Sequence, residues 1–436
     1  MIKNPISRYC IFFRQIINIF FKKVKLKNIY LFIKSILKSK KFRILYFDEQ
    51  NIKNHKQSNF CYELNKDYKF TNNKFHSENF NIKSVTLRNI TYRYFLMQNA
   101  FVMPNTNVIF TKKNCWLGSR EQKTKGKNFF EIHEFDNLKN ILLGNNKYYK
   151  YFFKFNSEKD CIIDSSIFSS QSNYKEGISL LSAINNYWHF LIETAPKILL
   201  ANHLNIPKDI PFLIMDNLHQ NLYEILYILN SKIDNRKIIK IPSTLGSQMP
   251  IKISNLYNIS DHMNLPLHIP KETNLRSCNF YFDKKPIVEL INIVQEHYQI
   301  KNEIDNKIKL FLYRENTWRI SKDQEKLKQM LIGKGYQVFN PEKMSFRDQV
   351  EIVSKASSFI GFSGAGFANA LFLPIKSKKI LIANSYYGPL VNIWDYLLEN
   401  IDFIENANKY EFGNNDVHGS PYLSIKNWEL IDELTN

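Results

Sequence analysis

The last third of the chain alternates short apolar runs with segments of helical periodicity, and this alternation restricts the fold more than any other feature. Runs such as KLFLY at residues 309–313 are short and strongly apolar, which is typical of buried strands. Strands that alternate with helices of about ten residues form a parallel sheet with helices on both faces. The predicted strands are 309–313, 336–339, 358–361 and 379–382, and the predicted helices are 286–298, 322–332, 345–356, 365–372 and 392–400.

The length of 436 residues favours more than one domain, and 44% hydrophobic residues are enough for a core in each. We divide the chain into an N-terminal arm (1–47), an N-terminal domain (48–285), a C-terminal domain (286–405), and a C-terminal tail with a helix (406–436). In the N-terminal domain the apolar pattern predicts strands at 107–110, 161–163, 212–215, 238–241 and 251–256, and helices at 186–204 and 221–229.

Positive charge is concentrated in the arm. The formal net charge is +20, and residues 1–47 hold twelve Lys and Arg residues and no acidic residue. A protein that binds nucleic acid concentrates its cations along a groove or helix of the folded body, so we expect no nucleic-acid partner. Five widely spaced cysteines without a CxxC pair disfavour a disulfide framework or structural zinc site and favour a reducing compartment.

The arm also has an amphipathic pattern. Apolar residues recur at helical spacing from Ile6 to Phe20, and basic and polar residues occupy much of the other side. No apolar run approaches the ~18 residues of a membrane span. The pattern predicts a basic helix on an anionic membrane surface, in a cytoplasmic protein bound peripherally to the inner face of the cytoplasmic membrane. The alternative is an ordinary helix packed on its own domain.

Glycine is scarce, with 13 residues in the chain, yet Gly361, Gly364 and Gly366 all fall within IGFSGAGFAN. This segment lies where a predicted strand ends and a helix begins. Glycines there let the backbone approach a ligand closely, and the helix N-terminus favours an anion such as a diphosphate. Ser363 can add a hydroxyl donor, and Asn369 lies one turn inside the helix. The alternative is a tight turn without a ligand.

Two arginines, Arg314 and Arg319, follow the strand predicted at 309–313. Arginines at the carboxyl end of a strand can bind phosphate in bidentate geometry. The alternative is a pair of surface arginines that form ion pairs with Glu315 or Asp323.

A histidine and a glutamate, His189 and Glu193, lie four residues apart in NNYWHFLIETAPK and therefore share one face of the predicted helix. Asn185 or Asn186 can cap that helix. A histidine beside a carboxylate can serve as a general base, because the carboxylate fixes its tautomer. The alternative is a satisfied His–Glu pair on a packed aromatic helix.

Several common motifs are absent from the sequence. There is no D-x-D pair for a metal–nucleotide complex and no G-x-x-x-x-G-K-[ST] phosphate loop. The spacing G-x-x-G-x-G differs from the dinucleotide fingerprint and lies late in its domain, which disfavours hydride transfer. G-x-S-x-G is also missing, which argues against a nucleophile elbow.

The three segments, in this order and spacing, resemble glycosyltransferase family 61 over about residues 100–435. Bacterial members of that family take part in the synthesis of capsular and other surface polysaccharides. The residues at matching positions are Asn186, Tyr187, His189, Glu193, Pro196 and Lys197, then Arg314 and Arg319, and then Pro341, Glu342, Ser345, Phe346, Gln349, Gly364, Ala365, Gly366 and Asn369.

The resemblance implies a GT-B fold, in which two Rossmann-like domains face each other across a cleft and the C-terminal one holds the nucleotide-sugar. It further implies an inverting glycosyltransferase that needs no metal or other cofactor and transfers a sugar to a glycan acceptor, which the basic arm suggests is lipid-linked. His189 or Glu193 would supply the catalytic base. The donor would be bound by Arg314, Arg319, Ser363, Gly364, Ala365, Gly366 and Asn369.

Two positions depart from the family pattern. The family usually has a histidine where Ser363 stands, and it tends to carry an acid at the end of the next strand, where residues 382–384 are neutral. These departures favour a second interpretation, a non-catalytic glycan-binding or scaffold subunit. A third interpretation is a GT-B enzyme of the same pathway that transfers a group other than a sugar.

Overall fold

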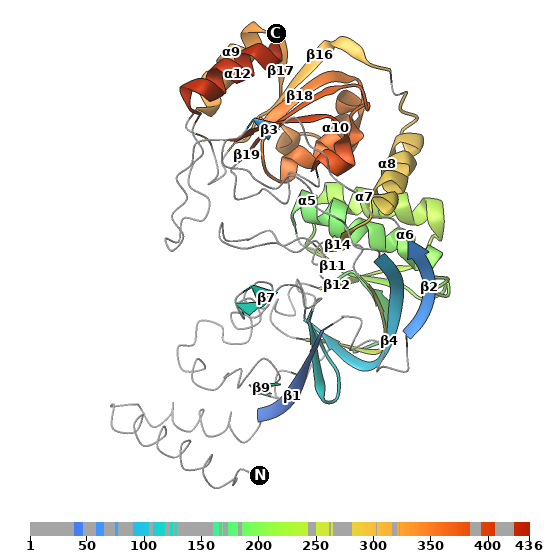
Figure 1. Cartoon of the computed structure of the whole chain (residues 1–436). Helices are drawn as coiled ribbons and strands as arrows, with labels where there is room; N and C mark the ends of the chain where they lie inside the picture. Colours follow the sequence, from blue (N-terminus) through green and yellow to red (C-terminus); the bar gives the residue numbers. More distant parts are fainter. Residues whose placement is uncertain are drawn as a thin grey trace, which may run out of the picture.

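Figure 1 shows a computed structural model of the chain, which describes residues 39–46, 58–64, 75–76, 90–103, 108–117, 123–124, 127–128, 160–164, 168, 173–181, 185–242, 250–260, 263–264, 281–301, 303–315, 321, 323–383, 394–405 and 423–436. The amphipathic helix predicted in the arm lies outside these residues, as does Arg319. Among the residues described, no helix combines the length and the hydropathy that a membrane span requires.

A parallel sheet of six strands has the order β17–β16–β18–β19–β20–β3; five strands come from the C-terminal half of the chain, and the edge strand β3 comes from residues 75–76. Its first five strands follow the order 2-1-3-4-5 of a doubly wound sheet, in which the chain reverses direction across the sheet between the first and third strands. This switch point therefore lies between β16 and β18. The strands are β16 (Asp305–Leu312), β17 (Tyr336–Phe339), β18 (Ala356–Phe362), β19 (Lys378–Ala383), β20 (Ile401–Glu405) and β3 (Phe75–His76).

Helices cover both faces of this sheet (Figure 1), as the alternating pattern predicted. One face carries α9 (Gln324–Gly333) and α12 (Ile425–Thr435) over a core that includes Phe311 and Ile360. The other face carries α8 (Lys285–His297), α10 (Phe346–Val353) and the helix η7 (Ala365–Phe372). The segment 365–372 is a 3-10 helix, which begins with a bond from Phe367 N–H to the Gly364 carbonyl (2.9 Å).

The N-terminal half contains a ten-stranded mixed sheet. Its parallel part has the order β12–β11–β10–β13, which is the order 3-2-1-4 of a Rossmann-like sheet, and the other strands extend it mainly in antiparallel fashion. The parallel strands are β10 (Asn173–Ser179), β11 (Phe212–Met215), β12 (Ile238–Ile241) and β13 (Ile251–Ile259). The others are β4 (Ile90–Val102), β2 (Ser58–Leu64), β5 (Ile109–Phe110), β6 (Asn114–Leu117), β1 (Ser39–Tyr46) and β9 (Asp160–Asp164).

Two strand pairs lie outside the large sheets: β7 (Lys123–Thr124) with β8 (Lys127–Asn128), and β14 (Met263–Asn264) with β15 (Tyr281–Phe282). The mixed α/β class is confirmed. The GT-B arrangement of the two halves remains a prediction.

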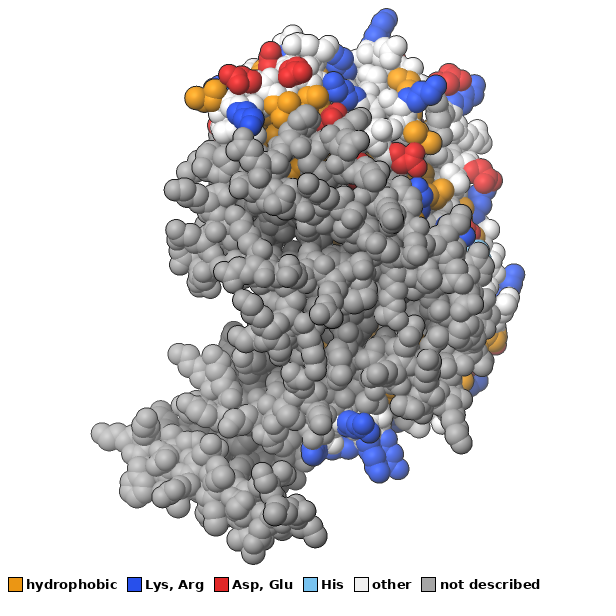
Figure 2. Space-filling model, in the orientation of Figure 1, with side chains coloured by type: hydrophobic (Ala, Val, Ile, Leu, Met, Phe, Trp, Pro, Cys, Tyr) orange, Lys and Arg blue, Asp and Glu red, His pale blue; other side chains and the backbone are white. Residues whose placement is uncertain are grey.

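The end of the segment assigned to the arm belongs to the large sheet. Strand β1 (Ser39–Tyr46) pairs with β6 and β9, and Phe42 packs its ring against Phe110 and Phe168, each at 5.3 Å between centroids. Exposed cations lie on β1 and on the turn before β6: Lys40, Lys41, Arg43, Lys112 and Lys113. Figure 2 shows Lys and Arg side chains gathered at the lower end of the molecule, whereas both signs of charge alternate over the C-terminal half.

The predicted helix 186–204 is divided into three segments: α5 (Tyr187–His189), the π-helix η3 (Phe190–Thr194) and α6 (Ala195–His203). The wide turn of η3 ends two residues before Pro196. Proline has no N–H to donate, and in a regular helix its ring would collide with the carbonyl four residues back. Together with α7 (Gln220–Ile233), these segments lie between the two sheets (Figure 1) and share one buried cluster with η7 and α10.

Candidate functional site

The two predicted donor-binding segments follow the strands on either side of the C-terminal switch point. Arg314 stands two residues after β16, and Ser363 and Gly364 directly follow β18. The Ser363 N–H donates to the Ile382 carbonyl of β19 (2.8 Å), so the backbone is held to the sheet up to that residue. In doubly wound sheets, ligands bind outside the carboxyl ends of the strands at such a switch point.

The side chain of Arg314 lies against the backbone of Gly364. A Cβ atom at Gly364 would stand 1.7 Å from Nη2 of Arg314, and the backbone at Gly364 has φ +156° and ψ −179°, which residues other than glycine rarely adopt. Nη2 also donates a long hydrogen bond to the Phe362 carbonyl (3.5 Å), and the Gln324 amide donates to the Arg314 carbonyl (2.9 Å). Because Gly364 has no side chain, the Arg314 guanidinium can lie against the backbone at the start of η7.

The other two glycines of the segment serve close packing. A Cβ on Gly361 would stand 2.6 Å from the Cβ of Leu312, its partner on β16, and a Cβ on Gly366 would stand 3.2 Å from Cδ1 of the same leucine. Gly361 therefore lets β18 pack closely on the end of β16, and Gly366 lets the start of η7 lie against the same leucine. Ala365, between Gly364 and Gly366, is half-buried.

The acids considered as partners of Arg314 make other contacts. Glu315 forms an ion pair with Lys343 (Oε2 to Nζ, 2.5 Å), and Asp323 accepts a hydrogen bond from the Leu423 N–H (2.7 Å). Because Arg319 lies outside the described residues, the structure describes one member of the predicted arginine pair.

His189 and Glu193 are in contact, as their spacing predicted. Nδ1 of His189 lies 2.6 Å from Oε1 of Glu193, and the two side chains are 28% and 40% exposed. Asn186 caps the segment, because its side chain accepts from the His189 N–H (3.2 Å). A carboxylate at Nδ1 favours the tautomer with its proton on that nitrogen, which leaves the lone pair on Nε2. The pair can therefore act as a histidine base oriented by a carboxylate.

The segment PEKMSFRDQ lies beside the glycine segment and η7: a Cβ on Gly366 would stand 3.5 Å from Cγ of Pro341, and the ring of Phe346 meets Phe372 edge-on at 5.8 Å. The Gln349 amide donates to the carbonyls of Pro341 (2.9 Å) and Met344 (3.1 Å), and Ser345 caps α10 through the Asp348 N–H (3.1 Å). Phe346 has no exposed surface. The printed contacts of these residues are structural, a role that their sequence pattern does not distinguish from ligand binding.

The first and third predicted segments meet at one hydrogen bond. The Tyr187 hydroxyl on α5 donates to Oδ1 of Asn369 on η7 (3.1 Å), and Nδ2 of Asn369 donates to the Gly366 carbonyl (3.0 Å). Asn369 has no exposed surface, and both ends of its amide bind protein groups. Burial raises the pKa of Tyr187 well above 10.0, so its hydroxyl keeps its proton and remains a donor.

Aromatic packing reinforces the contact between α5 and η7. Trp188 packs on Trp394 at 4.4 Å between centroids, and Trp394 meets Phe367 of η7 edge-on at 5.2 Å. Tyr187 was noted only as a position that matches the family pattern, and Trp188 was not predicted to be functional. An aromatic residue at helical spacing looks the same in the sequence whether it fills a core or joins two segments. Among the described residues, no group of three His, Cys, Asp or Glu side chains is placed to hold a metal ion.

Comparison with known proteins gives one family. No curated protein matches the chain. One family model matches a region that begins at Tyr187 on α5 and ends within β19. The matched region therefore includes the His189–Glu193 pair, Arg314 and the glycine segment. Residues 187–380 match the model of the family Glycosyltransferase 61, which supports the resemblance indicated by the three segments and, with it, glycosyltransferase activity.

Proposed function

We propose that the protein is an inverting glycosyltransferase that needs no metal and moves a sugar from a nucleotide-sugar to a hydroxyl of a growing, lipid-linked capsular or surface glycan. The contact between Arg314 and Gly364 carries the proposal. It places a cation over a glycine turn at the switch point of the C-terminal sheet, where such sheets bind nucleotides.

The donor diphosphate is held at this turn. Its charge is met by the Arg314 guanidinium, which can bind phosphate oxygens with two N–H groups, and by backbone N–H groups at the start of η7. Ser363, half-buried beside them, adds a hydroxyl. When the bond between the anomeric carbon and the diphosphate oxygen breaks, its electron pair goes to the diphosphate, and these donors stabilise the charge that develops.

The acceptor is activated from α5. Nε2 of His189, with Glu193 at Nδ1, takes the proton of the acceptor hydroxyl, and the resulting oxygen attacks the anomeric carbon from the face opposite the diphosphate. One C–O bond forms as another breaks, so the configuration at that carbon inverts. Asn369 acts on the donor indirectly, since its amide shapes the loop through the Gly366 carbonyl.

The basic N-terminal region brings the enzyme to its lipid-linked acceptor. The sequence of residues 1–38 is rich in Lys and Arg, and the described part of the chain adds exposed cations on β1 and on the turn before β6 (Figure 2). Clustered Lys and Arg residues attract an anionic leaflet by about 1 kcal/mol each. We therefore place the protein peripherally on the inner face of the cytoplasmic membrane.

The first test is a panel of UDP-, GDP-, CMP- and dTDP-sugars, with binding and slow hydrolysis measured on the full chain with and without EDTA. One donor that is bound and hydrolysed regardless of EDTA is the expected result. Arg314→Lys should weaken binding of the matching nucleoside diphosphate about tenfold, because lysine cannot bind two phosphate oxygens in fork geometry. Arg347→Lys, at an exposed arginine paired with Glu351, is the control. Equal affinity in both variants would place the donor site elsewhere.

A non-catalytic glycan-binding subunit is the second candidate, and one observation favours it. Ser363 stands in place of the histidine of the family pattern, and Ile382 and Ala383 at the end of β19 are neutral and buried. Donor binding without turnover, even with a native glycan acceptor, would favour this candidate. Turnover of an activated donor of another group would instead favour a transferase of a non-sugar group.

A further inference from the structure

The hydrogen bond from Tyr187 to Asn369 joins two segments that lie 182 positions apart and carry different parts of the site. Tyr187 is two residues before the base His189 on the same helical segment, and Asn369 lies on η7, directly after the glycine turn that receives the diphosphate. The bond is therefore a direct link between the acceptor side and the donor side.

The link continues into the glycine turn itself. Asn369 accepts from Tyr187 with its carbonyl oxygen and donates to the Gly366 carbonyl with its amide nitrogen, so the orientation of the amide is determined from both ends. All three groups are half-buried or buried, where a hydrogen bond is shielded from competing water. A shift of the Tyr187 hydroxyl changes the orientation of Asn369 and, through it, the position of Gly366.

We propose that Tyr187 is a positioning residue for the reaction: its hydroxyl holds α5, and with it His189, at a constant distance from the diphosphate-binding turn. The inference rests on the proposed function. A base on one segment and a leaving group on another must be aligned to within a fraction of an ångström, and a misplacement of about 1 Å can lower the rate about a hundredfold.

The chain provides a matched control in Tyr298. Its hydroxyl also makes a half-buried hydrogen bond between helices, to Glu224 of α7 (2.5 Å), and its ring meets Phe346 edge-on at 6.0 Å. The Tyr187 ring meets the same Phe346 at 6.4 Å. Tyr187→Phe and Tyr298→Phe therefore remove the same atom from similar surroundings, and only the first touches the link between α5 and η7.

The experiment compares both variants of the full chain with the wild type, using the donor that the panel identifies. Tyr187→Phe should lower kcat for donor hydrolysis about tenfold to a hundredfold. It should leave the Kd of the nucleoside diphosphate within about twofold, because the contact between Arg314 and Gly364 does not include Tyr187. Tyr298→Phe should leave kcat unchanged. Equal kcat in the two variants, or a Tyr187→Phe defect confined to the Kd, would overturn the inference.

Hydrogen exchange separates this inference from the proposed function. Peptides that cover residues 186–194 and 364–372 should exchange faster in Tyr187→Phe than in either the wild type or Tyr298→Phe. If the wild type hydrolyses no nucleotide-sugar, the proposed function fails, and the exchange data alone decide whether the link exists. Unchanged exchange in both peptides of Tyr187→Phe refutes the link whatever the activity.

Discussion

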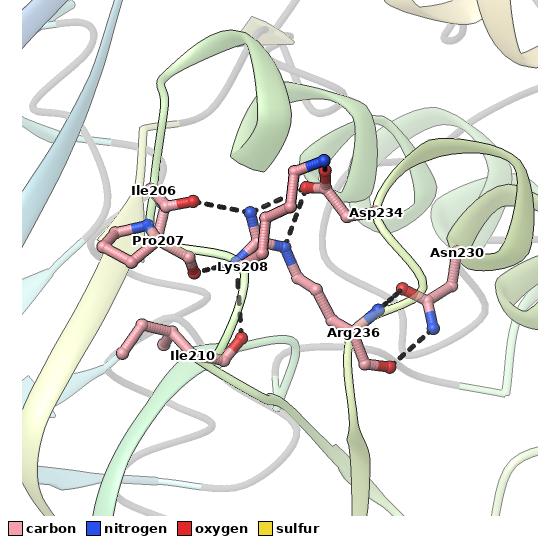
Figure 3. A network of polar contacts seen from close by, with 7 residues as sticks. All are labelled: Ile206, Pro207, Lys208, Ile210, Asn230, Asp234 and Arg236. Atoms are coloured by element: carbon pink, nitrogen blue, oxygen red, sulfur yellow. Dashed lines mark hydrogen bonds and ion pairs between the residues drawn. The ribbon is translucent and has the colours of Figure 1, made fainter.

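Replacing Arg236 by methionine should destabilise the N-terminal half by about 3–5 kcal/mol, the cost of leaving one partner of a buried ion pair alone. Arg236 and Asp234 lie between α7 and β12 with side chains 1% and 2% exposed, and they are joined at 2.7 Å (Nη2 to Oδ2) and 3.0 Å (Nε to Oδ2). Figure 3 shows the guanidinium also donating to the carbonyls of the α6–β11 connection, at Ile206 (2.7 Å), Pro207 and Ile210 (3.4 Å).

The magnitude follows from what methionine leaves behind. The Asp234 carboxylate stays in a site with almost no water, and its remaining ion pair, to the 72% exposed Lys208, is longer at 3.4 Å. The carbonyls of Ile206, Pro207 and Ile210, which accept hydrogen bonds from Arg236, also lose their charged donor. Each buried polar group left without a partner costs about 1–3 kcal/mol. Adding Asp234→Asn to Arg236→Met removes the stranded charge, so the double variant should recover about 1–3 kcal/mol.

Urea unfolding of the full chain, followed by far-UV circular dichroism, measures these changes, and hydrogen exchange in residues 206–215 locates them. Arg347→Met, at an exposed arginine paired with Glu351 (2.6 Å), is the control and should leave the urea midpoint unchanged. A loss below about 1 kcal/mol for Arg236→Met, or a double variant less stable than the single one, would refute the reasoning.

Three further predictions concern the site and its surroundings. Gly364→Ala should weaken nucleoside diphosphate binding by about 1–3 kcal/mol in calorimetry, because its Cβ displaces the arginine and strains the backbone, whereas Gly333→Ala, with nothing within 4 Å of its Cβ, should not. His189→Ala should abolish donor hydrolysis and preserve donor affinity, and turnover in this variant would remove His189 from the mechanism. His203→Ala, which breaks a similar pair with a glutamate at 2.9 Å, is the control and should leave both hydrolysis and affinity unchanged. Burial, with the hydrogen bond to its glutamate partner, raises the pKa of Tyr298 above 10.0, so the stabilisation from its protonated hydroxyl is present below pH 10 and is lost as pH rises. The urea midpoint should therefore fall more steeply between about pH 9 and about pH 11 in the wild type than in Tyr298→Phe, and parallel curves would contradict this.

Four of the five strands that the C-terminal half contributes to its sheet could be predicted, because each depends on a short stretch of sequence, whereas β20 (Ile401–Glu405) was not predicted. The apolar runs predicted both ends of β17 correctly and each end of β19 to within one residue. The turn at Gly364 was predicted because glycine is scarce in the rest of the chain. The contact between His189 and Glu193 could also be predicted, since residues four apart on a helical segment face each other. The π-helix after His189 was not predicted, because Pro196 is compatible with several local solutions and packing selects one.

Local sequence determined where the strands end, which turn requires glycine, and which residues on one helix can touch. Tertiary structure decided the rest. The strand order put Arg314 and Gly364 on neighbouring strands at the switch point, and packing brought Tyr187 to Asn369 across 182 positions. Packing also placed Phe346 of α10 against Phe372 of η7. The physical reason is that periodicity reports the burial of one face within a few turns, whereas a contact between distant segments depends on how whole layers pack.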